Sequence, residues 1–114
     1  MNKKDLGKSG EKRIVEYLQR RGWTILETNF RYHKKEVDII ARKDEIISFI
    51  EVKTRRRSGF GMGMEAVDWL KRKSIIQVAR HYLEKHGSIE ALVRFDVASI
   101  DGNVVSYFED AFRC

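Results

Sequence analysis

The chain has little cysteine, no internal repeat and no long apolar run. A lone cysteine, Cys114, excludes an intrachain disulfide and argues against a thiol-ligated zinc site. The three histidines show no metal-ligand spacing with one another or with this cysteine. No apolar stretch approaches the ~20 residues of a membrane span, and no signal-peptide pattern is present, so we expect a cytoplasmic protein. The length of 114 residues predicts a single domain over residues 1–114.

Positive charge predominates. The chain has 23 lysines and arginines against 17 aspartates and glutamates, a net charge of +6 and a pI of about 9.6. Two clusters, Lys53–Arg57 and Lys71–Lys73, concentrate this charge. Such an excess suits a protein that contacts the phosphates of a nucleic acid, although each cluster alone can equally be solvated surface.

Two apolar runs predict a β-hairpin. The run Ile46–Thr54 is apolar at both parities up to Ile50, as in a central strand covered on both faces. The run Val37–Ala41 precedes it, and the polar link 42–45 is short enough for a hairpin turn. We expect the turn to centre on residues 44–45.

This register brings charged groups together. It sets Asp38 directly opposite Glu51, and Glu36 opposite Lys53, whereas a slip of one residue would move Asp38 to the other face. Glu51 and Lys53 share a face, roughly 7 Å apart along the strand. Two carboxylates this close on an apolar sheet repel and lose hydration, which a bound cation or the adjacent ammonium would offset. An acid-x-lysine tripeptide can also be an ordinary cross-strand pair, so the spacing leaves both interpretations open.

A helix expected over about residues 6–21 adds another carboxylate. Ile14, Val15 and Leu18 recur at helical spacing, and Glu11 belongs to their face. A carboxylate on the packing face of a helix is unusual without a partner. The alternative is a first-turn glutamate that complements the helix dipole.

The other segments complete an αβββαββ order. We expect a strand at 23–28 that leads through 29–32 into the hairpin, and a long helix that begins near Trp69 and ends at a Gly87 cap. Two further strands follow at about 91–100 and 104–108, joined by an Asp-Gly turn. The expected apolar stripe of the long helix consists of Trp69, Ile75, Ile76, Ala79, Tyr82 and Leu83.

Two local features have more than one interpretation. The glycine-rich loop at about 56–64 is a connector, or alternatively a flap that orders against DNA or a partner subunit. In the strand at 91–100, Arg94 and Asp96 share a face and suit a structural ion pair. Phe95 and Val97 would then face the core.

Several motifs occur in a fixed order over nearly the whole chain. They are Gly10-Glu11, Asn29-x-Arg31, Glu36-Val37-Asp38-Ile39-Ile40, Phe49-x-Glu51-Val52-Lys53-Thr54-Arg55 and Arg94-Phe95-Asp96-Val97. This order resembles the YraN-like family of small bacterial proteins. That family belongs to the PD-(D/E)xK nuclease-like superfamily and is similar to archaeal Holliday junction resolvases. The resemblance implies an α/β (α+β) fold, with a mixed central sheet flanked by helices and a restriction-endonuclease-like core.

The resemblance also implies roles for four residues. Those matching Asp38 and Glu51 ligate Mg²⁺ or Mn²⁺, and the lysine matching Lys53 orients or activates the attacking water. The residue matching Glu11 is a further active-site acid that could hold a second metal ion. The chain departs from the family at Lys35, where glycine is usual, and at Val37, where isoleucine is usual. It also lacks the superfamily's name-giving proline.

The implied activity is metal-dependent hydrolysis of DNA, with branched DNA as the resolvase-like substrate and a homodimer to cut two symmetric strands. The residues expected to contact nucleic acid are Arg31, Arg55, Arg56, Arg57, Lys71 and Lys73. Two alternatives remain from other classes. One is a non-catalytic nucleic-acid-binding module on a nuclease scaffold. The other is an interaction protein that binds a partner through Phe60, Met62, Met64 and Trp69.

Overall fold

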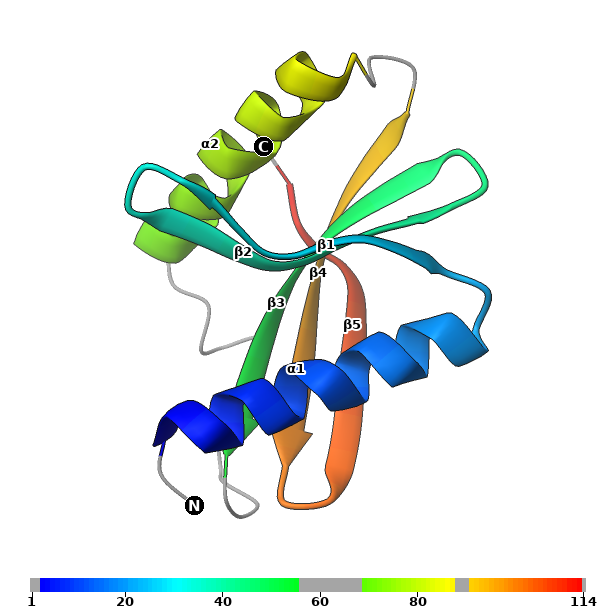
Figure 1. The fold of residues 1–114 in the computed structure, drawn as a ribbon, viewed down its shortest axis with the longest axis vertical. Helices are drawn as coiled ribbons and strands as arrows, with labels where there is room; N and C mark the ends of the chain where they lie inside the picture. The colour runs from blue at the N-terminus through cyan, green and yellow to red at the C-terminus, as the bar shows by residue number, and fades with distance from the viewer. Residues whose placement is uncertain (1–2, 56–68, 88–90, 114) are drawn as a thin grey trace.

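The computed structural model describes residues 3–55, 69–87 and 91–113, without the side chains of 3–7 and 55. Its elements follow the expected αβββαββ order (Figure 1). They are α1 (Lys3–Arg20), β1 (Thr24–Tyr32), β2 (Lys35–Lys43), β3 (Ile46–Arg55), α2 (Trp69–His86), β4 (Leu92–Asp101) and β5 (Val104–Phe112).

The strands form one mixed sheet in the order β1-β2-β3-β4-β5. Neighbouring strands are antiparallel except β3 and β4, which are parallel. A parallel pair needs a crossover connection, and α2 lies within it. The two helices cover opposite faces of the sheet (Figure 1). The predicted α+β class, a mixed sheet flanked by helices, is therefore confirmed.

Each face of the sheet has its own hydrophobic core. The core under α2 includes Phe49 and Val78, and the core under α1 includes Ile14 and Ile50. Phe49 and Ile50 are adjacent on β3, and both are completely buried. This confirms that β3 is a central strand covered on both faces.

The apolar stripe of α2 differs in part from the prediction. Ile75, Ala79 and Tyr82 are buried as expected, together with Val78, which the prediction omitted. The prediction was wrong for Trp69, which is 66% exposed. Trp69 is the first residue of α2, ahead of the turns that pack on the sheet, and its ring contacts Lys73 of the same helix. The Gly87 cap is as expected, with φ 65°.

The β2–β3 hairpin has the predicted register. Its pairs run from Ile39↔Ile50 to Lys43↔Ile46, around a turn in which Asp44 has φ 53°. Few residues other than Asn, Asp and Gly adopt this left-handed conformation readily, so Asp44 fits the turn.

Two strands are longer than predicted. β1 does not end at 28 but continues to Tyr32, past Asn29, whose φ is 51°. β5 does not end at 108 but continues to Phe112, past Asp110, whose φ is 52°. In β5 the left-handed residue lies within the register shift of the strand, whereas the register shift of β1 comes earlier, between Ile25 and Glu27. Beyond the left-handed residues, Phe30 and Phe112 pack on the α2-side core.

Arg94 and Asp96 form the predicted ion pair, with 2.9 Å between Arg94 Nε and Asp96 Oδ1. Asp96 is fully buried. It also accepts hydrogen bonds from the Ser48 hydroxyl and the Tyr107 hydroxyl, both at 2.7 Å, and from the backbone N–H of Asp110 at 2.9 Å. A buried carboxylate is tolerated because these donors satisfy it. Phe95 and Val97, on either side, face the α2-side core as expected.

Neither α1 nor α2 combines the length and apolarity that a membrane crossing requires.

Candidate active site

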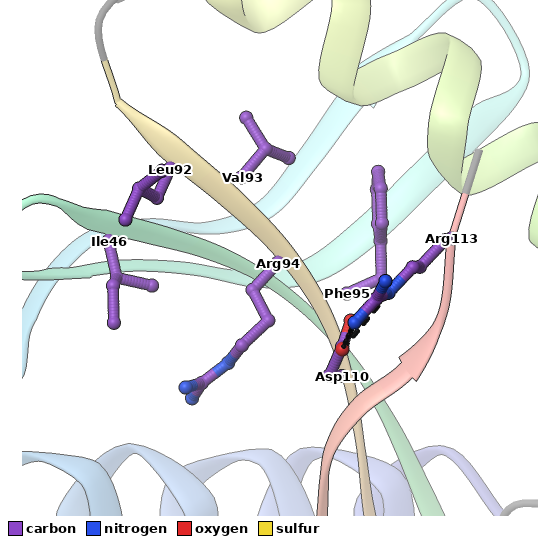
Figure 2. Close-up of a pocket in the computed structure, with 7 residues that line it drawn as sticks. All are labelled: Ile46, Leu92, Val93, Arg94, Phe95, Asp110 and Arg113. Atoms are coloured by element: carbon purple, nitrogen blue, oxygen red, sulfur yellow. Dashed lines mark hydrogen bonds and ion pairs between the residues drawn. The ribbon is translucent and has the colours of Figure 1, made fainter.

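A cavity of about 590 Å³ lies at the end of the sheet where β3 and β4 begin (Figure 2). Its lining residues are Ile46, Leu92, Val93, Arg94, Phe95, Asp110 and Arg113. Ile46 is the first residue of β3, whereas Glu51 lies in the second half of that strand. Both arginines of the cavity pair with carboxylates, Arg94 with Asp96 and Arg113 with Asp110. None of the predicted site residues that the structure describes lines this cavity.

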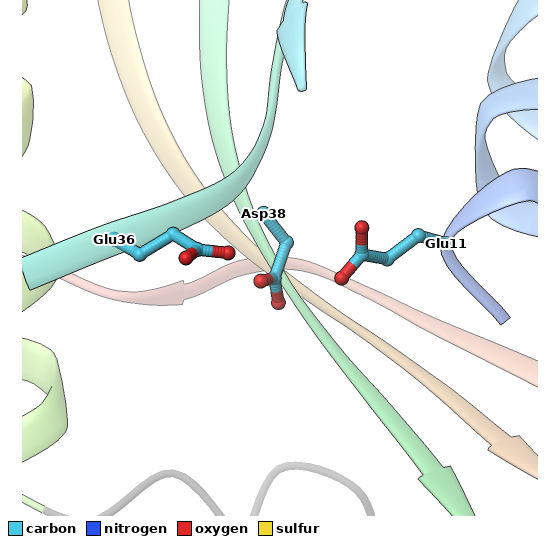
Figure 3. A group of neighbouring side chains, drawn as sticks. All are labelled: Glu11, Glu36 and Asp38. Carbon is cyan, nitrogen blue, oxygen red and sulfur yellow. The ribbon is translucent and has the colours of Figure 1, made fainter. Parts of the chain in front are cut away.

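Three carboxylates from two elements converge elsewhere (Figure 3). Glu11 of α1 and Glu36 and Asp38 of β2 each offer an oxygen, and these oxygens lie within 4.8 Å of one another. All three residues are half-buried. We call this group the acidic cluster. It brings together two predicted site residues, Glu11 and Asp38, with a third that was not predicted.

The acidic cluster forms where β2 separates from β3. The pairing of these strands ends at Ile39 and Ile50, so the expected pairing of Glu36 with Lys53 is not part of the ladder. Beyond that point Asp38 Oδ2 accepts the backbone N–H of Val52 at 2.8 Å. The side chain thereby satisfies a β3 donor that strand pairing leaves open. Asp38 stays beside β3 while the backbone of β2 moves away.

Gly10 brings α1 close to the end of β3. A Cβ atom on Gly10 would lie 2.2 Å from Thr54 Oγ1 and 3.2 Å from Thr54 Cβ, which is too close for any other residue without rearrangement. The absence of a side chain therefore allows the helix to approach β3. The adjacent Glu11 consequently reaches the acidic cluster from the helix side.

Asn29 joins two of the carboxylates. Its side-chain Nδ2 donates to Glu11 Oε1 at 2.8 Å and to Glu36 Oε1 at 2.9 Å. Arg31 lies 3.0 Å from the other oxygen of Glu36. The two amide hydrogens of Asn29 thus bridge α1 and β2, and they partly offset the repulsion between the two glutamates.

Glu51 is the most buried predicted ligand, at 5% exposure. Its Oε2 lies 3.2 Å from Lys71 Nζ of α2, but no donor among the described residues makes a hydrogen bond of good geometry to it. A buried carboxylate oxygen without such a bond is costly, even with a cation nearby. Glu51 therefore retains capacity for a further electropositive ligand.

Burial, a hydrogen bond with Glu51 and the charge of Glu51 together raise the pKa of Asp38 to about 8, against the opposing effects of the Val52 N–H and Lys71. Burial also raises the pKa of Glu11, which the hydrogen bond from Asn29 opposes. In each case the carboxylate loses hydration and lies close to other carboxylates, and both effects disfavour its charged form. Without a counter-ion, the site therefore favours a bound proton.

Lys53 occupies β3 two residues after Glu51 and is half-buried. The ladder between β3 and β4 runs without a break from Ile46 to Arg55, and Lys53 pairs with Ser99. In an unbroken strand, residues two apart share a face, so Lys53 and Glu51 lie on the same side of β3. This agrees with the predicted arrangement, and the catalytic role of Lys53 stays a prediction.

The residues predicted to contact phosphate have different surroundings in the structure, and their role stays a prediction. Arg31 and Lys71 lie against carboxylates of the site, Glu36 and Glu51 respectively. Lys73 lies 4.3 Å from the ring centre of Trp69. The side chain of Arg55, and all of 56–64 with Arg56, Arg57 and the glycine-rich loop, fall outside the described part of the chain.

Sequence reasoning missed two residues of this region, Glu36 and Asn29. A signal for Glu36 was present, because it lies two positions before Asp38 on the same strand. Asn29 gave no comparable signal, since its position depends on a left-handed residue inside a strand.

Taken together, these features define a small α+β protein with clustered carboxylates at an opening of its central sheet. The model of the family described as "Uncharacterised protein family UPF0102" matches residues 10–100. Two proteins named "UPF0102 protein" are similar over most of their length. The one from Alkaliphilus metalliredigens is 44% identical over 112 residues, covering 96% of this chain and 98% of the relative. The one from Caldicellulosiruptor saccharolyticus is 42% identical over 104 residues, covering 91% and 88%. The chain belongs to the UPF0102 family, the YraN-like family indicated by its motifs.

Proposed function

We propose that this protein is a divalent-metal-dependent endonuclease that hydrolyses phosphodiester bonds of DNA. One observation carries the proposal. Carboxylate oxygens of Glu11, Glu36 and Asp38 lie within 4.8 Å of one another, and Asp38 also adjoins the buried Glu51. Carboxylates held this close repel one another and lose hydration, and a bound cation would offset this cost.

The donor set fits Mg²⁺ or Mn²⁺. All donors are carboxylate oxygens, which these hard cations prefer. Oxygens that ligate Mg²⁺ lie about 2.1 Å from it and therefore up to about 4.2 Å apart, close to the separation in the acidic cluster. Asp38, Glu51 and Glu11 would hold the ion, with Glu36 as an additional ligand. A bound ion would supply Lewis-acid chemistry and a more acidic water.

The residues of the chain have separate tasks in this proposal. Lys53, on the Glu51 side of β3, orients the attacking water or neutralises charge that develops on the phosphate. Asp38 is held against β3 by the Val52 N–H. Asn29 orients Glu11 and Glu36 through the two hydrogen bonds that it donates. Lys71 balances the charge of the buried Glu51.

Branched DNA is the proposed substrate, on the basis of the resemblance to junction resolvases. Symmetric cutting of two strands requires two sites related by a two-fold axis, so a homodimer is part of the proposal. Light scattering on the purified protein measures the oligomeric state directly.

The test is cleavage of a synthetic four-way junction, with linear duplex and single-strand substrates, in Mn²⁺, Mg²⁺ or EDTA. Glu51→Gln removes a ligand charge, and Glu45→Gln is the matched control because Glu45 is exposed in the β2–β3 turn. We expect metal-dependent cutting that Glu45→Gln retains and Glu51→Gln loses by orders of magnitude. If neither metal supports cutting but all three proteins bind DNA equally, the non-catalytic binding module becomes the better description.

A further inference from the structure

Six rings form a continuous series that leads from the α2-side core to the tip of the β1–β2 hairpin. We call it the ring ladder; from the core outward it consists of Phe49, Tyr82, Phe30, His81, Tyr32 and His33. Successive ring centres lie 6.0, 5.1, 6.3, 4.0 and 4.4 Å apart. The innermost ring is fully buried, and the outermost, His33, is exposed.

The hairpin tip is fixed on α2 at two points. Tyr32 stacks on His81 with 18° between the ring planes. Lys35 Nζ donates a hydrogen bond to Gln77 Oε1. The turn residue His33 has φ 58°, and it carries its ring at the end of the series. The exposed ring is therefore presented on a supported hairpin.

Cationic residues neighbour the members of the ring ladder along the chain. Lys34 is exposed at the turn, and the exposed Arg80 precedes His81 on α2. The side chain of Arg31 is 71% exposed while it pairs with Glu36. Aromatic rings interspersed with cations suit a single nucleic-acid strand, because bases stack on the rings and phosphates pair with the cations.

The tip also adjoins the acidic cluster. Lys35 is the residue before Glu36 on β2, and Arg31 is the partner of Glu36 across the β1–β2 ladder. At about 3.3 Å per strand residue, His33 lies on the order of 10 Å from Glu36. A strand held at the acidic cluster thus reaches the tip within a few nucleotides.

We infer that the hairpin tip binds an unpaired stretch of DNA next to the bond that is cut. An unpaired base stacks on His33, and the neighbouring phosphates contact Lys34 and Arg80. Bases inside a duplex are already stacked on one another, so a continuous duplex cannot use His33 in this way. The inference rests on the proposed function for the choice of DNA as ligand, and it narrows the substrate to DNA with unpaired nucleotides.

The test is fluorescence anisotropy of a short labelled oligothymidine, with a labelled duplex for comparison, in EDTA so that no strand is cut. His33→Asn removes the ring but keeps a residue that tolerates a left-handed backbone. Lys34→Gln removes one cation, and Arg20→Gln is the matched control, because Arg20 is exposed at the far end of α1. Circular dichroism checks that each variant is folded.

We expect His33→Asn to bind the single strand about five-fold or more weakly and the duplex as the wild type does. For single-strand binding, the slope of the logarithm of the binding constant against the logarithm of salt concentration should become shallower by about 0.7 in Lys34→Gln. Arg20→Gln should leave this slope unchanged. Wild-type single-strand binding by both tip variants would overturn the inference. Equal losses for single strand and duplex in His33→Asn would overturn it as well.

Failure of this inference is distinguishable from failure of the proposed function, because binding is measured without metal and without cleavage. Metal-dependent cutting with normal binding by the tip variants would leave the nuclease standing and refute the role of the tip. Impaired single-strand binding by the tip variants, without cutting by any protein, would support DNA binding by the tip and refute the nuclease.

Discussion

The carboxylate of Asp38 accepts the backbone N–H of Val52 at 2.8 Å, across the opening where β2 leaves β3. A side chain thus replaces a strand-to-strand hydrogen bond just beyond the last pair of the ladder, Ile39↔Ile50. Because Val52 follows Glu51 directly, the contact holds two predicted metal ligands side by side. The cost of this proximity is visible in the pKa of Asp38, which is raised to about 8.

The first prediction concerns stability and pH. The pKa of Asp38 is higher in the folded protein, about 8, than the ordinary aspartate value of 3.8, so between these values the folded state binds more protons than the unfolded state. The stabilising contribution of the protonated carboxyl is complete below about pH 4 and is lost as pH rises through about 8. In EDTA, Asp38→Asn should therefore raise the free energy of unfolding at pH 8, on the order of 1 to 3 kcal/mol, and change it little at pH 4.

Urea unfolding of both proteins at several pH values measures this difference. The amide oxygen of asparagine can still accept the Val52 N–H, so the local structure should be retained. A stability difference that does not depend on pH would contradict the raised pKa.

The second prediction concerns Asn29. Asn29→Asp replaces a donor shared by Glu11 and Glu36 with another carboxylate. In EDTA it should lower the free energy of unfolding by about 1 to 2 kcal/mol, from lost hydrogen bonds and like-charge repulsion. Added Mn²⁺ should then raise its melting temperature more than that of the wild type, since a bound cation offsets the extra charge.

Asn29→Gly is the control, because it keeps the left-handed backbone and adds no charge. It should be destabilised without gaining a larger response to Mn²⁺. An equal response to Mn²⁺ in Asn29→Asp, Asn29→Gly and the wild type would show that Asn29 does not orient metal ligands.

The third prediction concerns the contact of α1 with β3. In a helix interior, alanine usually stabilises relative to glycine by about 0.5 to 1 kcal/mol. At Gly10 the added Cβ would lie 2.2 Å from Thr54 Oγ1, so Gly10→Ala should instead destabilise, by about 1 to 3 kcal/mol.

Thr54→Ala removes the atom that obstructs the new Cβ. The double variant Gly10→Ala/Thr54→Ala should therefore be more stable than the sum of the two single effects, with a coupling of about 1 kcal/mol or more. Additive effects in a double-mutant cycle would mean that the helix does not approach β3 as closely as the structure shows.

The fourth prediction separates structural from catalytic carboxylates. Tyr107→Phe removes a hydroxyl that donates to the buried Asp96 at 2.7 Å. It should cost about 1 to 3 kcal/mol of stability, because a buried carboxylate loses a donor. Metal-dependent cleavage per folded molecule should be unchanged. A loss of cleavage activity larger than the loss of folded protein would assign Asp96 to the active site.

The sequence predicted the parts of this structure that depend on local pattern. The β2–β3 hairpin was predictable because both apolar runs and the short link of residues 42–45 agree on one register. The acidic cluster was predictable only in part. The convergence of Glu36 with Glu11 depends on Asn29 and on the separation of β2 from β3 after Ile39, and no local pattern encodes either.

The end of β5 could not be predicted from local sequence pattern either. Asp110 adopts a left-handed conformation inside the strand, and its backbone N–H donates a hydrogen bond to Asp96 of the neighbouring strand β4. This contact exists only once β4 and β5 are assembled. From the sequence alone, an aspartate at this position therefore predicts the end of the strand. The exposed Trp69 was mispredicted for a related reason, because helical spacing does not tell where a helix begins to touch its sheet.

The irregularity at Asp110 also limits how the sheet can extend. β5 is an edge strand, and between its pairs Val97↔Phe108 and Phe95↔Phe112 three residues oppose one. This segment is bent, and it carries the exposed charged residues Glu109 and Asp110, features that disfavour edge-to-edge association. A second copy of the chain that joined its own β5 here would find a regular hydrogen-bonding edge only along residues 104–108. A two-fold assembly in which two sheets join through their β5 strands is therefore disfavoured, and the proposed dimer would have to form through another surface.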